Sequence, residues 1–129
     1  MIYQHSELAA GRWHQLSFLE QMANVGSEVE RALNWKLKGN SAYCLKASER
    51  ALELMDLTLA DTTIFSHLKE LSRVRETLAD YFFGDNEFQS SESSLRKYFL
   101  KFTYAARKDR EQILPLQPLQ ESLSRRTVT

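Results

Sequence analysis

The feature that most constrains this chain is a run of apolar residues at helical spacing between residues 16 and 37. These residues recur every three or four positions and therefore form one continuous stripe on a helix. The stripe consists of Phe18, Met22, Val25, Val29 and Ala32, and Leu19, Gly26 and Leu33 lie beside it. Because the stripe is wide, it predicts a helix that contacts two neighbours.

Local signals predict both ends of this helix. Ser17 and Glu20 stand in capping-box spacing and favour a start at Ser17; the alternative is an earlier start near Arg12, with Trp13 and Leu16 extending the stripe. Gly39 suits the position after the last turn, where glycine tolerates a left-handed backbone. Gly26, in the middle, costs the helix roughly 1 kcal/mol relative to alanine. We interpret it as a position where a neighbouring helix approaches closely.

Three further segments have helical periodicity, at about residues 42–60, between the polar break at 61–63 and Gly84, and from about residue 95 to 114. Their expected inner residues are Leu45, Ser48, Leu52, Met55 and Leu59; Phe65, Leu68, Leu71, Val74, Leu78 and Phe82; and Leu95, Tyr98, Phe99, Phe102, Ala105 and Ala106. The sequence predicts an all-α fold, an antiparallel up-down-up-down four-helix bundle over residues 1–114. An αα-solenoid is the alternative. Residues 115–129 lack periodicity and are expected to be a flexible tail, either mobile or ordered by a partner.

The composition of the chain indicates the cellular compartment in which the protein is expected. The single cysteine of the 129-residue chain excludes an internal disulfide, and no apolar run reaches the roughly 18 residues of a membrane span. The first residues lack a secretory signal pattern. We therefore expect a cytoplasmic protein without a membrane segment. The apolar surplus on the expected helices further predicts a homo-oligomer.

The motifs of common enzymes and metal sites are missing. The histidines His5, His14 and His67 are dispersed and none follows a glutamate by three residues, so we expect no metal and no cofactor. Phosphate loops, nucleophile elbows and the Arg-to-His spacing of one helical ribonuclease family are also lacking. Cys44 is interpreted as a small buried hydrophobe, with a pKa lowered by the helix dipole as the alternative. An enzyme would have to rely on a polar pocket around Asn24, Glu28, Arg31 and Glu53.

Charge is distributed unevenly along the chain. Residues 1–94 carry nine basic and fourteen acidic side chains, whereas residues 95–110 carry six basic side chains against Asp109 alone. The candidate nucleic-acid-binding residues on this fourth helix are Arg96, Lys97, Lys101, Tyr104, Arg107, Lys108 and Arg110. The cations suit a phosphate backbone and Tyr104 suits stacking on a base. The alternative is that these cations balance helix dipoles and the acidic remainder of the bundle.

Two tryptophans bracket the first long helix. Amphipathic tryptophan occurs both at core edges and at interfaces between proteins. Trp13 and Trp35 are therefore candidates for an oligomer or partner interface, with a position at the core edge as the alternative.

Residues 21–58 resemble a group of small bacterial four-helix-bundle proteins. The residues that carry the resemblance are Gln21, Ala23, Gly26 and Ser27 in the first helix and Ala47, Glu53 and Leu54 in the second, although Glu49-Arg50 stands where the group has Gly-Ser. The group comprises proteins encoded in intervening sequences of the large ribosomal RNA gene and the accessory variability protein of diversity-generating retroelements. The resemblance implies a non-enzymatic, commonly oligomeric bundle, and in the retroelement branch a partner of reverse transcriptase and nucleic acid.

These observations favour a non-enzymatic oligomeric adaptor. Its basic fourth helix would bind RNA or DNA, or a protein that handles nucleic acid, such as a reverse transcriptase. The alternative is a purely protein-binding structural bundle with no role in nucleic-acid binding.

Overall fold

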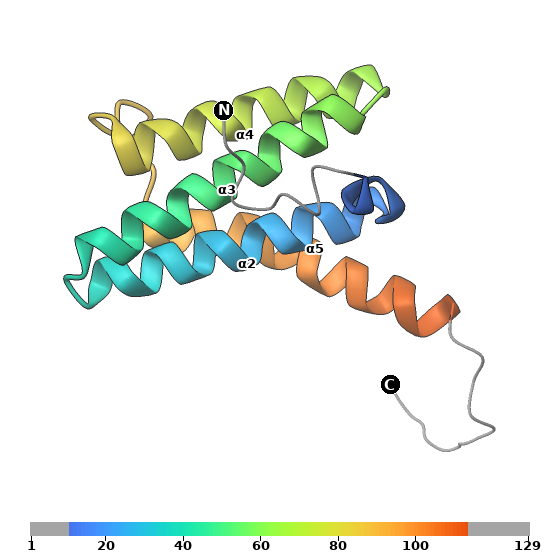
Figure 1. Ribbon diagram of the computed structural model, residues 1–129, viewed down its shortest axis with the longest axis horizontal. Helices are drawn as coiled ribbons and strands as arrows, with labels where there is room; N and C mark the ends of the chain where they lie inside the picture. Colours follow the sequence, from blue (N-terminus) through green and yellow to red (C-terminus); the bar gives the residue numbers. More distant parts are fainter. Residues whose placement is uncertain (1–10, 114–129) are drawn as a thin grey trace, which may run out of the picture.

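The computed structural model describes residues 11–113, with side chains described as far as residue 108. A short 3₁₀ helix, η1, is followed by four α-helices, and the described residues contain no strand. Their bounds are η1 Arg12–Gln15, α2 Phe18–Leu37, α3 Ser41–Asp61, α4 Phe65–Phe83 and α5 Glu92–Ile113. The predicted all-α four-helix bundle is confirmed, and successive long helices run in alternating directions (Figure 1). The predicted tail, residues 115–129, lies outside the described residues.

The ends of α2 follow the local signals in the sequence. The Ser17 hydroxyl accepts a hydrogen bond from the Glu20 N–H at 3.1 Å, and the Glu20 carboxylate accepts one from the Ser17 N–H at 2.9 Å. After the helix, Gly39 has a φ of 77°, and the N–H groups of Gly39 and Asn40 donate to carbonyls of the last turn. This pattern is a Schellman motif, so the start at Ser17 and the end at Gly39 are confirmed, whereas the earlier start near Arg12 is wrong because residues 12–15 form the separate helix η1.

Gly26 marks the crossing of α2 and α5. A Cβ atom built on this glycine would lie 2.9 Å from the Cβ of Phe99. Real Cβ atoms do not come this close, so a larger residue would push the two helices apart. The predicted close approach of a neighbouring helix is confirmed.

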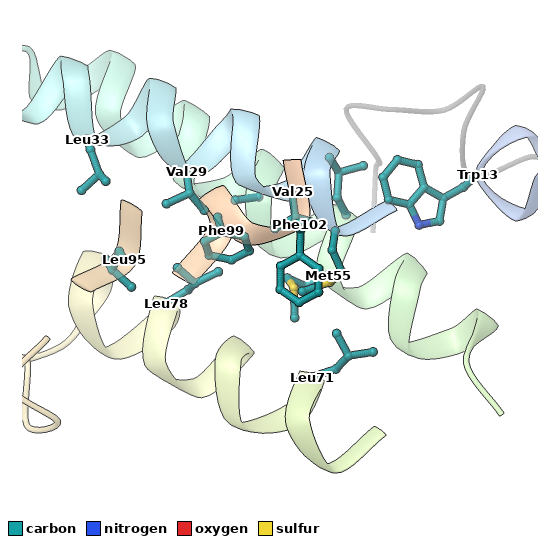
Figure 2. Packing of buried hydrophobic residues seen from close by; sticks show 13 residues of the cluster. Trp13, Val25, Val29, Leu33, Met55, Leu71, Leu78, Leu95, Phe99 and Phe102 are labelled. Atoms are coloured by element: carbon teal, nitrogen blue, oxygen red, sulfur yellow. The ribbon is translucent and has the colours of Figure 1, made fainter. Parts of the chain in front are cut away.

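The helix α2 is the centre of the bundle, because its backbone packs most extensively on α3 and next on α5, while α4 packs on α3. The core lies between these helices, and Figure 2 shows Phe99 and Phe102 of α5 pointing into the space between α2 and α4. Its fully buried members include Met22, Val25, Val29, Leu33, Met55, Leu71 and Leu78. None of the helices in this part of the chain combines the length and apolarity that crossing a membrane requires.

Two residues that were predicted to face the core are exposed instead, so these two predictions are wrong. Leu45 on α3 is 46% exposed, because the face of α3 that meets the core is centred on small and medium residues, among them Ala47, Ala51 and Thr58. Phe65 is 77% exposed, because it lies in the first turn of α4, outside the span of Leu71 and Leu78 that faces the core. Size alone therefore misplaced both side chains.

Candidate functional site

The helix α5 has one buried and one exposed face. Leu95, Phe99, Phe102 and Ala106 are buried against the rest of the bundle. Opposite them lie Lys97, Leu100, Lys101, Tyr104, Arg107 and Lys108, all exposed, and we call these six residues the basic face. At 1.5 Å per residue, the basic face spans about 16 Å along the helix.

The four cations of the basic face form no ion pair with any carboxylate whose side chain the structure describes. These cations are Lys97, Lys101, Arg107 and Lys108. The Lys101 ammonium instead lies 4.5 Å from the ring centroid of Tyr98, and that of Lys108 lies 5.6 Å from the ring centroid of Tyr104. A cation–π contact leaves the charge of the ammonium uncompensated, so the face is a positive surface.

Arg96, one of the predicted binding residues, is in a different environment. Its guanidinium donates to the carboxylates of Glu92 and Glu30 and to the side-chain oxygen of Asn34. Desolvation opposes the charged form, but the hydrogen bonds to the two carboxylates raise the pKa of Arg96 overall. This arginine therefore joins α5 to α2 within the chain. Arg110, also predicted, belongs to α5, but its side chain lies outside the described residues.

Tyr104 and Leu100 supply apolar surface within the positive charge. Tyr104 is 60% exposed and Leu100 is 66% exposed. Both line a shallow depression along α5 together with Lys97, Lys101, Thr103 and Arg107. The basic face thus offers a ring and an aliphatic side chain as well as cations.

Tyr98, six residues earlier on α5, lies at the border between the basic face and the buried face. It is partly buried, and its hydroxyl donates to the carboxylate of Glu70 on α4. Burial, and then the hydrogen bond to Glu70, raise the pKa of Tyr98 well above its ordinary value. This tyrosine holds α5 against α4.

Trp13, predicted as an interface residue, is only 1% exposed and packs in the chain's own core. Its Nε1–H donates to the hydroxyl of Thr58 on α3 at 3.0 Å. Figure 2 shows the indole between η1 and the end of the bundle. The position matches the alternative of a core-edge tryptophan, because the short η1 helix folds the indole inward and Thr58 accepts from its only side-chain donor.

The polar residues around Trp13 form a network that the sequence analysis did not identify. The buried Gln21 amide donates to the Trp13 carbonyl at 2.9 Å and to the Asp61 carboxylate at 3.0 Å, and His14 Nδ1 lies 2.6 Å from the same carboxylate. The hydrogen bond from Gln21 and then that from His14 lower the pKa of Asp61. Gln21 and Thr58, polar residues at inward positions, were the available signal.

Part of the Trp35 side chain is exposed to solvent. It is half-buried, packs edge-on against Tyr43 with ring centroids 4.8 Å apart, and lies under the Lys38 ammonium at 5.0 Å. Tyr43 itself is 53% exposed. Of the two predicted interface tryptophans, Trp35 is the one with surface available to another molecule.

Of the residues suggested for an enzymatic pocket, Glu53 is half-buried, and the other three are hydrogen-bonded within the chain. Glu28 accepts hydrogen bonds from Arg31 at 2.9 Å and from Arg50 at 3.2 Å, while Asn24 is exposed and donates to the Glu20 carbonyl. Cys44 is half-buried. Within residues 11–108, the His, Cys, Asp and Glu side chains form no group of three or more that could hold a metal ion.

No family model matches this sequence, and neither a curated protein nor a solved structure shows significant similarity to it. The resemblance of residues 21–58 to the small bacterial bundle proteins therefore stays a prediction.

Proposed function

We propose that this protein is a non-enzymatic helical adaptor that binds nucleic acid through the basic face of α5. The observation that supports this proposal is that Lys97, Lys101, Arg107 and Lys108 share one exposed face and are paired with no carboxylate of the described residues. Neutralisation of phosphates by such cations supplies most of the affinity of non-specific nucleic-acid binding. The buried face of the same helix fixes their positions.

The proposal extends to the wider setting of the chain. The resemblance supports a homo-oligomer that works beside a protein that handles nucleic acid, such as a reverse transcriptase, and the single cysteine supports a cytoplasmic location. Multiple copies would multiply the number of phosphate contacts. The purely protein-binding alternative now depends on Trp35 with Tyr43 rather than on both tryptophans, because Trp13 is buried.

A salt titration tests the proposal. Affinity for a fluorescent oligonucleotide, measured by anisotropy, should fall steeply as the salt concentration rises. If the four cations of one copy contact four phosphates, the slope of log K against log salt is about −2.8 on a single strand, and affinity falls about 50-fold from 50 to 200 mM salt. Affinity that does not depend on salt would remove the electrostatic basis of the proposal.

Two double variants that each remove two lysine charges distinguish a contribution of the basic face from an effect of total charge. Lys101→Gln/Lys108→Gln should reduce the steepness of the slope by about 1.4, because two phosphate contacts are lost. Lys46→Gln/Lys69→Gln removes the same charge from exposed positions on α3 and α4 and should leave the slope unchanged. Equal effects of the two double variants would contradict an interface on α5.

A further inference from the structure

The surroundings of Tyr104 are specific to this residue. On a helix, the side chains that neighbour a residue are those three and four positions away in either direction. For Tyr104 these positions hold Leu100, Lys101, Arg107 and Lys108, so three of its four neighbours are cations. The exposed ring is therefore at the centre of the positive surface.

Other exposed aromatic residues lack this arrangement. Phe65 is 77% exposed, but of the cations only Lys69 stands at one of its neighbouring positions. Tyr98 of α5 is itself near Lys101, but its hydroxyl is bound to Glu70 and its ring belongs to the core. The Tyr104 hydroxyl has no hydrogen-bond partner among the described residues.

An exposed ring amid cations distinguishes two forms of nucleic acid. In a duplex, each base face is covered by the next base pair, so only phosphates and groove edges are available to a helix. In a single strand, the bases are free to stack on an aromatic ring while the backbone contacts cations nearby. Leu100, 66% exposed in the same depression, adds apolar surface beside the ring.

We propose that the basic face binds single-stranded nucleic acid in preference to duplex, with a base stacked on Tyr104 and phosphates on the surrounding cations. This inference rests on the proposed function of the same face. The cations supply affinity for any polyanion, and the ring supplies the preference for an unpaired base.

Four polyanions of equal length test the preference at one ionic strength. The probes are an oligodeoxythymidylate of about 12 nucleotides, a duplex of the same length, an abasic strand with the same phosphates and a polyglutamate peptide. The thymidylate should bind tightest. Tyr104→Ala should weaken its binding about 5- to 150-fold, the range that loss of one stacked base produces, and should leave binding of the abasic strand and of the duplex unchanged.

Two further variants of Tyr104 test whether the aromatic ring itself is required. Tyr104→Phe keeps the ring and should retain the affinity for the thymidylate, whereas Tyr104→Leu should lose it. Equal or tighter binding of the duplex, or equal losses on the abasic strand, would overturn the stacking inference while leaving the proposed function standing. Equal binding of polyglutamate, or no salt-dependent binding of any nucleic acid, would overturn the proposed function itself.

Discussion

Replacement of Thr58 by valine should destabilise the protein without changing the shape of its core. Valine and threonine are similar in size, so the substitution leaves no large cavity. It does remove the oxygen that accepts the Trp13 Nε1–H at 3.0 Å. Thr58 is fully buried and Trp13 is 1% exposed, so water cannot replace the lost acceptor.

The magnitude follows from the cost of a buried donor without a partner, which is about 1–3 kcal/mol. For a chain of this length, each kcal/mol lowers the melting temperature by about 3–6 °C. Urea unfolding followed by circular dichroism at 222 nm measures the free energy of unfolding without relying on tryptophan fluorescence. The urea concentration at the midpoint of unfolding should fall, while the slope of the free energy of unfolding against urea concentration stays constant.

A double-mutant cycle identifies the hydrogen bond as the cause. Trp13→Phe removes the donor and some volume, so alone it is destabilising. In the Thr58→Val background, where the donor is already unsatisfied, the same change should cost at least about 1 kcal/mol less. If the loss in the double variant equals the sum of the two single losses to within about 0.5 kcal/mol, the two side chains are not coupled through the hydrogen bond, and the reasoning is refuted.

Three other substitutions test the fold, each by urea unfolding. Gly26→Ala should destabilise by up to about 2 kcal/mol, because the new methyl group against Phe99 outweighs the gain in helix propensity; a rise in stability would contradict the close approach. Leu71→Ala should lower the free energy of unfolding by about 2–5 kcal/mol because Leu71 is fully buried. Phe65→Ala, at an exposed position, should change it by less than about 0.5 kcal/mol. The reverse order would show that α4 packs on the bundle through another face. Hydrogen bonds lower the pKa of Asp61, so its stabilising effect is present above its unfolded-state pKa and is lost as the pH falls through the lower folded-state pKa. Asp61→Asn should therefore cost about 0.2–1 kcal/mol at pH 6 and less near pH 2, and a cost independent of pH would argue against the lowered pKa.

The boundaries of α2 could be predicted because their causes are local. Ser17 and Glu20 are three residues apart, and their reciprocal hydrogen bonds depend only on the backbone between them. Gly39 likewise ends the helix through bonds to the preceding turn. Signals of this kind are complete within a short stretch of sequence, so no knowledge of the tertiary structure is needed.

The inward face of α3 and the position of Trp13 could not be predicted in the same way. A large apolar residue such as Leu45 outranks Ala47 in hydrophobicity, but close packing of two helix backbones requires small residues at the crossing. Trp13 and Thr58 are 45 residues apart, and either is compatible with a surface position until the packing of η1 on α3 is known. Both positions depend on pairing between elements, which periodicity within one element does not encode.

The environment of each cation on α5 depends on its position around and along the helix. Near the start of the helix, α5 lies close to α2, and Glu30 and Asn34 reach the guanidinium of Arg96. Further along, α5 diverges from α2 and extends past the end of the bundle (Figure 1). Lys97 and the described cations from Lys101 onward lie on the face of α5 opposite its buried residues, and none of them forms an ion pair with an acidic residue of α2. The outward face of α5 thus carries four cations without an ion pair among the residues whose side chains are described, in a protein whose total formal charge is zero.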